Sequence, residues 1–110
     1  MADINKKELI HQYRTRTQTG GIYAIKNIKL NKWFVDSAQD LAAIKNRFEF
    51  MGTSFMKIAR DYTAQNGEGF VFEALEELEK GEAQTPKEFG DDLALLKSIW
   101  LEKLAGQELY

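Results

Sequence analysis

The spacing of apolar residues along the chain changes between helical and strand-like periods, and each change predicts an element boundary. Near the N-terminus, Leu9, Ile10 and Tyr13 recur at helical spacing among charged residues, which predicts a helix from Asp3 to about Thr15. The glycine-containing stretch Thr19-Gly20-Gly21 ends this helical pattern.

A β-hairpin is predicted next. Apolar residues run from Ile22 to Ile25 within an expected strand over residues 21–28. Leu30-Asn31-Lys32 provides a chain reversal, and Trp33-Phe34-Val35 predicts a second strand over residues 32–36.

A helix over residues 38–50 follows the hairpin. Its predicted apolar face consists of Leu41, Ile44, Phe48 and Met51. Ser37 and Asp40, three residues apart, form a variant of the capping box that starts a helix. Gly52 is expected to end it.

A further helix is predicted over residues 53–65, with Thr53 or Ser54 as its cap. Its apolar stripe consists of Phe55, Ile58, Ala59 and Tyr62. Asn66-Gly67 is a typical helix-terminating pair.

The last two elements are a strand and a long helix. Phe70 to Leu75 predicts a third strand over residues 69–76, and the glutamates from Glu76 onward are expected to form a solvated turn. Thr85-Pro86-Lys87-Glu88 combines an N-cap residue, a proline at the first helical position and an acid at the third. It predicts a helix over residues 86–104 whose apolar face is formed by Phe89, Leu93, Leu96, Trp100 and Leu104.

This order of elements predicts an α+β fold: a small, mainly antiparallel sheet covered by helices. With 110 residues, the chain suits a single domain. We expect residues 1–18 to form an N-terminal helical extension and residues 19–110 to form the domain.

Composition removes several classes of function. The chain has no cysteine, which excludes disulfides, thiolate metal sites and cysteine nucleophiles. Its one histidine, His11, excludes an HExxH zinc site and is expected to lie at the surface of the first helix. No apolar stretch is long enough for a membrane span, and the charged N-terminus does not resemble a signal peptide. We expect a cytoplasmic protein with no membrane partner.

The charges are separated along the chain, although the net charge is only −2. Residues 1–60 hold eleven Lys or Arg against five Asp or Glu, whereas residues 61–110 hold four against twelve. Four basic residues of the two central helices are candidates for contacts with nucleic acid: Lys45, Arg47, Lys57 and Arg60. Alternatively, they are ordinary solvent-exposed charges, or the basic half pairs with an acidic surface.

The triplet Gly21-Ile22-Tyr23, followed after ten residues by Phe34-Val35-Asp36, resembles the signature of the GIY-YIG endonuclease family. The resemblance covers about residues 19–104. It continues through Ile25-Lys26-Asn27, Ser37-Ala38-Gln39-Asp40-Leu41, Phe70 to Leu78 and Ile99-Trp100-Leu101. It implies a GIY-YIG-like fold, in which a three-stranded antiparallel sheet is flanked by helices.

The residues at the functional positions of that family depart from its pattern. Tyr23 retains the tyrosine that works near the attacking water, but Phe34 replaces the second tyrosine and Asp36 replaces the triplet glycine. Ile44 stands where the resemblance implies an arginine that contacts phosphate, and Lys97 stands where it implies a metal-binding glutamate. Losing one preorganised charge-stabilising donor typically costs about 2.7–4 kcal/mol of transition-state stabilisation. A lysine in the place of the metal ligand also repels the metal ion.

Two functions therefore remain open. The first is a degenerate, catalytically inactive GIY-YIG domain that binds nucleic acid weakly or binds protein, with no metal site and no cofactor. The second is an active endonuclease with an altered site, which uses Tyr23, Arg47 and an acid such as Glu73, and which requires Mg²⁺ or Mn²⁺. The positions three and four residues from Lys97 on its helix hold no carboxylate, which favours the first function.

The same residues also have structural interpretations. Tyr23 suits a strand tyrosine with a buried ring, Phe34 and Ile44 suit the core, and Lys97 suits a lysine at the surface. Trp33 and Trp100 are expected to pack against the sheet rather than to stack on bases.

Overall fold

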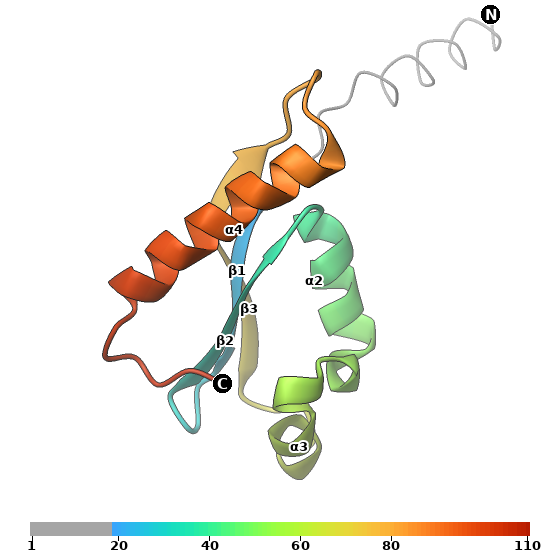
Figure 1. Ribbon diagram of the computed structural model, residues 1–110. Helices are drawn as coiled ribbons and strands as arrows, with labels where there is room; N and C mark the ends of the chain where they lie inside the picture. Colours follow the sequence, from blue (N-terminus) through green and yellow to red (C-terminus); the bar gives the residue numbers. More distant parts are fainter. Residues whose placement is uncertain (1–18) are drawn as a thin grey trace, which may run out of the picture.

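The computed structural model describes residues 19–110, so the helix predicted from Asp3 to Thr15, the extension over residues 1–18 and His11 lie outside the described residues. The described elements, in chain order, are β1 (Thr19–Asn27), β2 (Lys32–Ala38), α2 (Leu41–Phe50), the short 3₁₀ helix η1 (Gly52–Ser54), α3 (Met56–Ala64), β3 (Phe70–Glu79) and α4 (Pro86–Lys103). The predicted α+β architecture is confirmed (Figure 1).

The three strands form one antiparallel sheet in the order β2-β1-β3, so β1 is central and the other two are edge strands. In the hairpin, Tyr23 lies opposite Asp36 and Ile25 lies opposite Phe34. Asn31, at φ 50°, adopts the left-handed conformation that the predicted reversal requires. The pairing of β1 with β3 shifts register between Ile22 and Tyr23.

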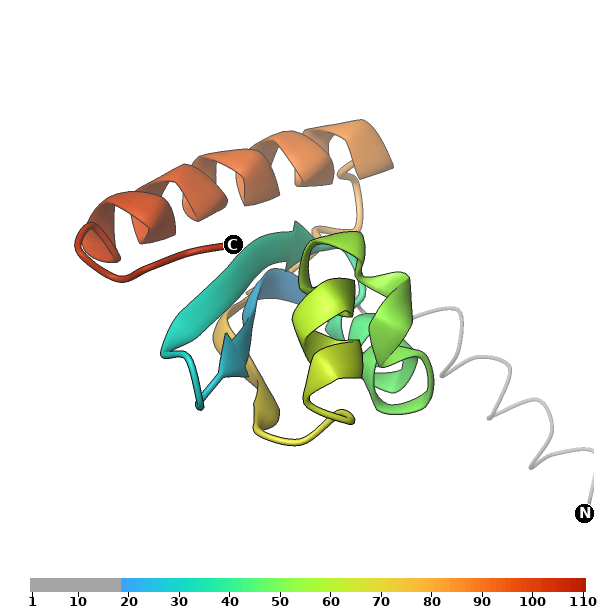
Figure 2. The ribbon, with the colours of Figure 1, turned by 90° about the horizontal axis from the view of Figure 1, so that it is seen from below.

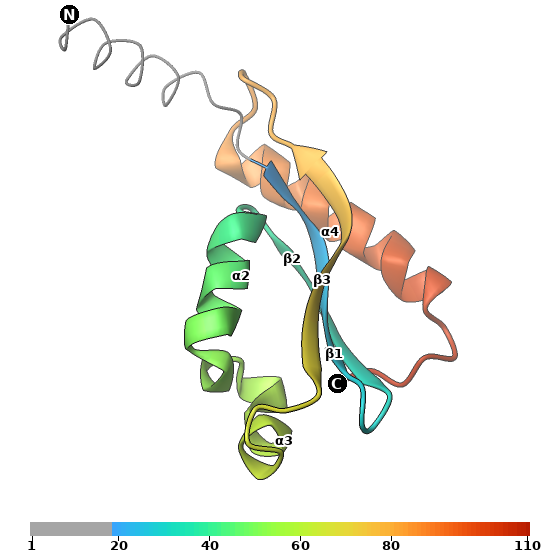
Figure 3. The ribbon, with the colours of Figure 1, turned by 180° about the vertical axis from the view of Figure 1, so that it is seen from behind.

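Helices cover both faces of the sheet. Figures 1, 2 and 3 show α4 along one face, with α2 and α3 on the other. Alternate residues of β1 therefore enter two cores, because successive side chains of a strand point to opposite faces. Ile22 and Ala24 pack on the α4 face, and Tyr23 and Ile25 pack on the α2–α3 face.

The predicted capping box at the start of α4 is confirmed. The Thr85 hydroxyl accepts a hydrogen bond from the Glu88 backbone N–H, and the Glu88 carboxylate accepts one from the Thr85 N–H. Phe89 and Leu93 are 0% and 1% exposed. Burying such a side chain contributes about 1.5–3 kcal/mol, so this apolar face fixes the helix on the sheet.

The start of α2 differs from the prediction. Ser37 belongs to β2, which continues to Ala38, and the helix begins at Leu41 rather than at residue 38. Asp40 is the N-cap, and its carboxylate accepts a hydrogen bond from the Ala43 N–H at 3.2 Å. Strand pairing with Gly21 keeps Ala38 extended, so the helix cannot begin there and the cap moves to Asp40, the second residue beyond the pairing.

The predicted cap of α3 was also wrong. Thr53 and Ser54 lie in η1, and α3 begins at Met56 after Phe55, which makes no side-chain capping bond. Phe55 is 5% exposed and packs in the core. Its burial therefore sets the entry to α3 in place of a polar cap.

The third strand is longer than predicted. β3 extends to Glu79, so Glu76 and Glu77 are paired strand residues rather than part of a turn. Thr19 and Gly20 extend β1 and pair with Glu79 and Leu78. Backbone pairing thus overrides the low strand preference of the glutamates.

A polar network joins Asn27, the last residue of β1, to the C-terminal residue Tyr110. Asn27 is 0% exposed, and its Nδ2 donates hydrogen bonds to Gln65 Oε1 at 2.7 Å and to the Tyr110 hydroxyl at 2.9 Å. That hydroxyl donates to Asp61 Oδ2 at 2.7 Å. Leu109 forms a parallel bridge with Trp33 at the edge of β2.

No helix within residues 19–110 has the length and apolar character needed to cross a lipid bilayer.

Replacing Gly21 with alanine should strongly destabilise the protein. A Cβ atom at this position would lie 2.0 Å from the backbone oxygen of Glu76, and the residue has φ +153°. We expect the Gly21→Ala variant to lose about 2 kcal/mol or more of unfolding free energy in urea titrations. Gly81→Ala is the control, because its Cβ would meet nothing nearer than 3.6 Å and its stability should change by less than about 0.5 kcal/mol. Equal stability of the two variants would contradict the predicted contact.

Candidate functional site

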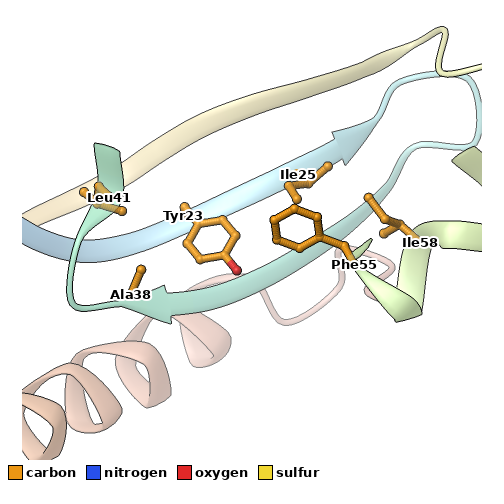
Figure 4. Close-up of a cluster of buried hydrophobic side chains, with 6 residues drawn as sticks. All are labelled: Tyr23, Ile25, Ala38, Leu41, Phe55 and Ile58. Carbon is orange, nitrogen blue, oxygen red and sulfur yellow. The ribbon is translucent and has the colours of Figure 1, made fainter. Parts of the chain in front are cut away.

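Tyr23, the tyrosine of the Gly21-Ile22-Tyr23 triplet, lies on the central strand of the sheet. This residue is 2% exposed and belongs to the core on the α2–α3 face. Figure 4 shows it in the same row of buried side chains as Ile25, Phe55 and Ile58. Its ring is therefore enclosed by the protein rather than displayed in an open cleft.

Aromatic side chains enclose the Tyr23 ring from both neighbouring strands. Phe72 stacks on it with a centroid distance of 5.3 Å, and Phe34 meets it edge-on at 6.2 Å. Ile44, from α2, is partly buried against the same core. Two positions at which the resemblance implies polar functional groups, Phe34 and Ile44, thus hold packing residues.

Burial raises the pKa of the Tyr23 hydroxyl well above its ordinary value. The negative charge of Asp36 raises the pKa further, and the positive charge of Arg47 opposes the change. The phenol therefore remains protonated at neutral pH. No side chain or backbone group among residues 19–110 forms a hydrogen bond with its oxygen.

Asp36 and Lys97 form an ion pair beside this tyrosine. The Lys97 ammonium lies 3.1 Å from Asp36 Oδ1, with side chains 35% and 40% exposed. Lys97 is on α4, so its side chain reaches past the edge strand β2 to a carboxylate opposite Tyr23. The Asp36 carboxylate also accepts a hydrogen bond from the Ser37 N–H at 2.8 Å.

The positions three and four residues from Lys97 on its own helix hold no carboxylate, so the helix pattern alone does not indicate this pair. The signal was present, because Asp36 and Lys97 both depart from the family pattern and carry opposite charges. Their proximity depends on α4 crossing the sheet near β2, which the sequence does not show. We name Tyr23, Asp36 and Lys97 together the Tyr23 site.

Arg47 has a local structural role. Its Nε donates to the Ser54 hydroxyl at 2.8 Å, and a terminal nitrogen donates to the Ser54 carbonyl at 2.9 Å. The guanidinium also stacks over the Phe55 ring at 4.4 Å. Arg47 therefore holds η1 against α2, and a phosphate would have to compete with these contacts.

The other three candidate cations are differently placed. Lys45, Lys57 and Arg60 are exposed, and none forms an ion pair with another residue of the described chain. Lys57 and Arg60 are three residues apart on α3 and share a helix face. Lys45 and Arg47 are only two apart on α2 and point in different directions.

The structure does not bring the alternative catalytic set together. Glu73 neighbours Phe72 on β3 and therefore points to the opposite face of the sheet from Tyr23. There it pairs with Lys26, whose ammonium also lies over the Trp33 ring. Tyr23 and Glu73 are thus separated by the sheet.

The two tryptophans pack on the α4 face of the sheet. Trp33 and Trp100 border the core formed by Ile22, Ala24 and Val35. The Trp100 indole N–H donates to Glu76 Oε1 at 2.8 Å. Within residues 19–110, no three His, Cys, Asp or Glu side chains are grouped as metal ligands.

Stability should fall at high pH because Tyr23 is buried in its protonated form. Its pKa is higher in the folded than in the unfolded chain, so this stabilisation is complete below about pH 10 and decreases as pH rises above it. Urea titrations from pH 7 to pH 11 should show a shallower decline in unfolding free energy for Tyr23→Phe than for the wild type. An equal decline of unfolding free energy with pH in both proteins would contradict a raised pKa of Tyr23.

Tyr110→Phe provides the contrast at pH 7. It removes hydrogen bonds to Asn27 and Asp61 and should cost about 1–2 kcal/mol, whereas Tyr23→Phe should change stability by less than about 1 kcal/mol. A larger loss for Tyr23→Phe than for Tyr110→Phe would contradict a purely packing role of the Tyr23 ring.

Comparison of the chain with protein-family models, with curated proteins and with solved structures found no match. The resemblance to the GIY-YIG family therefore remains an expectation from the sequence. The structure supplies the arrangement of those residues: a hairpin, a third antiparallel strand, and helices on both faces.

Proposed function

We propose that this chain is a degenerate GIY-YIG-type domain that does not cleave phosphodiesters and that binds nucleic acid through α2 and α3. The observation that carries the absence of cleavage is the ion pair between Asp36 and Lys97. By the resemblance, these residues replace the triplet glycine and the metal-binding glutamate. In the folded chain, Lys97 Nζ lies 3.1 Å from Asp36 Oδ1.

The donors around Tyr23 do not suit a divalent metal ion. Mg²⁺ and Mn²⁺ prefer oxygen ligands, and the carboxylate opposite Tyr23 is already paired with an ammonium group. A cation placed beside Asp36 would be repelled by Lys97. We therefore assign no step to Mg²⁺ or Mn²⁺ in this domain.

The remaining groups also give poor support to hydrolysis. Phosphodiester cleavage builds negative charge that preorganised cations must stabilise. Ile44 supplies no charge at the position where the resemblance implies an arginine, and the guanidinium of Arg47 is engaged by Ser54. Tyr23, protonated and enclosed by aromatic rings, is a poor acceptor for a proton from water.

Binding is supported by the charge on the helices opposite α4. Between Leu41 and Arg60 the chain holds four basic residues and one acidic residue, Glu49. Three of the basic side chains, those of Lys45, Lys57 and Arg60, are exposed and have no acidic partner within the described chain. Such cations release counterions when they contact phosphate, which gives weak, sequence-independent affinity.

Purified protein should leave single-stranded and double-stranded DNA intact in the presence of Mg²⁺ or Mn²⁺. The physical reason is the missing metal ligand and phosphate-binding arginine at Lys97 and Ile44. Gel electrophoresis of labelled oligonucleotides provides the measurement, with Tyr23→Phe as the matched variant. Cleavage by the wild type that Tyr23→Phe abolishes, with its fold preserved, would contradict the proposal.

Weak, salt-dependent binding to oligonucleotides is expected. The dissociation constant should lie at the non-specific scale of about 10⁻⁴–10⁻⁶ M and should rise steeply between about 50 and 200 mM salt. Fluorescence anisotropy of labelled DNA should show weaker binding by Lys57→Ala and Arg60→Ala. Lys87→Ala, on the opposite side of the sheet at the start of α4, is the matched control.

Affinity that ignores salt, or that Lys87→Ala reduces as much as Arg60→Ala does, would contradict this binding surface. A complete lack of binding would instead favour a protein partner for the domain.

A further inference from the structure

Two exposed surfaces on opposite sides of the sheet combine apolar side chains with charges of opposite sign. We name the first the α2–α3 surface and define it by Phe50, Met51, Met56, Lys57 and Arg60. We name the second the α4 surface and define it by Asp91, Leu95, Ile99 and Glu102. Neither surface belongs to the Tyr23 site.

The α2–α3 surface exposes unusually large apolar groups. Phe50 is 82% exposed, Met51 61% and Met56 89%. All three lie at the short connection in which η1 joins the end of α2 to the start of α3. Met56 shares a helix face with Arg60, so apolar and basic side chains are adjacent.

The α4 surface has the complementary composition. Leu95 and Ile99 are 65% and 41% exposed and lie one turn apart. Asp91 and Glu102 extend the same helix face at either end, and neither forms an ion pair within residues 19–110. These four side chains lie on the side of α4 opposite to Phe89 and Leu93, which are buried against the sheet.

From these surfaces we propose that the chain associates with a second copy of itself head to tail, the α2–α3 surface of one copy docking on the α4 surface of the next. Contact would cover the exposed apolar groups and place Lys57 and Arg60 beside Asp91 and Glu102. Figures 1 and 3 show the two surfaces' elements on opposite sides of the sheet, so each copy keeps a free surface of each kind.

Charge distinguishes this arrangement from a symmetric dimer. Two α2–α3 surfaces in contact would bring cations together, and two α4 surfaces would bring carboxylates together. Pairing through the β3 edge is opposed by its row of glutamates, which includes Glu73, Glu76, Glu77 and Glu79. A contact between two different surfaces leaves one free surface of each kind on the pair, so assembly should continue beyond the dimer, to chains or to a closed ring, as concentration rises.

Sedimentation velocity of the full chain, freed of nucleic acid, tests the proposal. The weight-average sedimentation coefficient should rise with protein concentration and fall when salt is raised from about 0.05 to 0.5 M, because added salt screens the charge pairs. Met56→Glu and Leu95→Lys should each raise the dissociation constant about tenfold or more. Leu30→Ser is the matched control, since Leu30 is 52% exposed on the β1–β2 turn, outside both surfaces, and its substitution should leave association unchanged.

Mixing the two variants gives the decisive result. The Met56→Glu chain keeps an intact α4 surface, and the Leu95→Lys chain keeps an intact α2–α3 surface. At a concentration at which the wild type is about half assembled, each variant should be mainly monomeric alone, and an equimolar mixture should recover dimers through the two intact surfaces. A monomeric wild type, a variant that self-associates as strongly as the wild type, or a mixture no more associated than either variant alone would overturn the proposal.

Circular dichroism of both variants should match the wild type because the substituted side chains are exposed.

This inference does not depend on the proposed function, since the nuclease assay and the oligonucleotide titrations measure different properties of the chain.

Discussion

β1 is buried on both faces and paired along both edges, and this double burial fixes where every other element of the fold must lie. Ile22, Tyr23, Ala24 and Ile25 are each no more than 2% exposed, so this short run contributes to both cores at once. Because side chains of a strand alternate, the helices must cover both faces to remove these residues from water. The two-sided architecture follows from that requirement.

The same constraint determines the chemistry of Tyr23. A tyrosine in a central strand is enclosed unless the covering helices leave an opening, and here Phe34, Phe72 and Ile44 fill the surroundings. The pKa of the phenol is consequently raised, and the Tyr23 ring packs as part of the core. The polar pair beside Tyr23 lies at the sheet edge, where β2 allows Asp36 and Lys97 to meet with partial access to water.

Charge is distributed between the two covering layers rather than around one cleft. The layer of α2 and α3 carries exposed cations, whereas β3 and the outer face of α4 carry carboxylates. Nucleic-acid binding and head-to-tail association both draw on the basic layer through Lys57 and Arg60. Occupation of that layer by one partner would therefore exclude the other, which links the two proposals physically.

Features that depend on local periodicity and local hydrogen bonding could be predicted from the amino-acid sequence. The hairpin reversal at Asn31 and the capping box at Thr85 and Glu88 were predictable because their partners lie within a few residues. So was the division into helices and strands, since apolar spacing reports which face of an element is buried. The α+β class followed from the order of those elements.

Contacts between residues of different elements became visible only in the folded chain. The tertiary structure extended β3 through Glu76 to Glu79, because pairing with β1 outweighed local preference. It placed Glu73 on the face opposite Tyr23, engaged Arg47 with Ser54, and brought Lys97 from α4 to Asp36 on β2. These outcomes depend on strand register and on the direction of α4 across the sheet, which no local pattern of residues encodes.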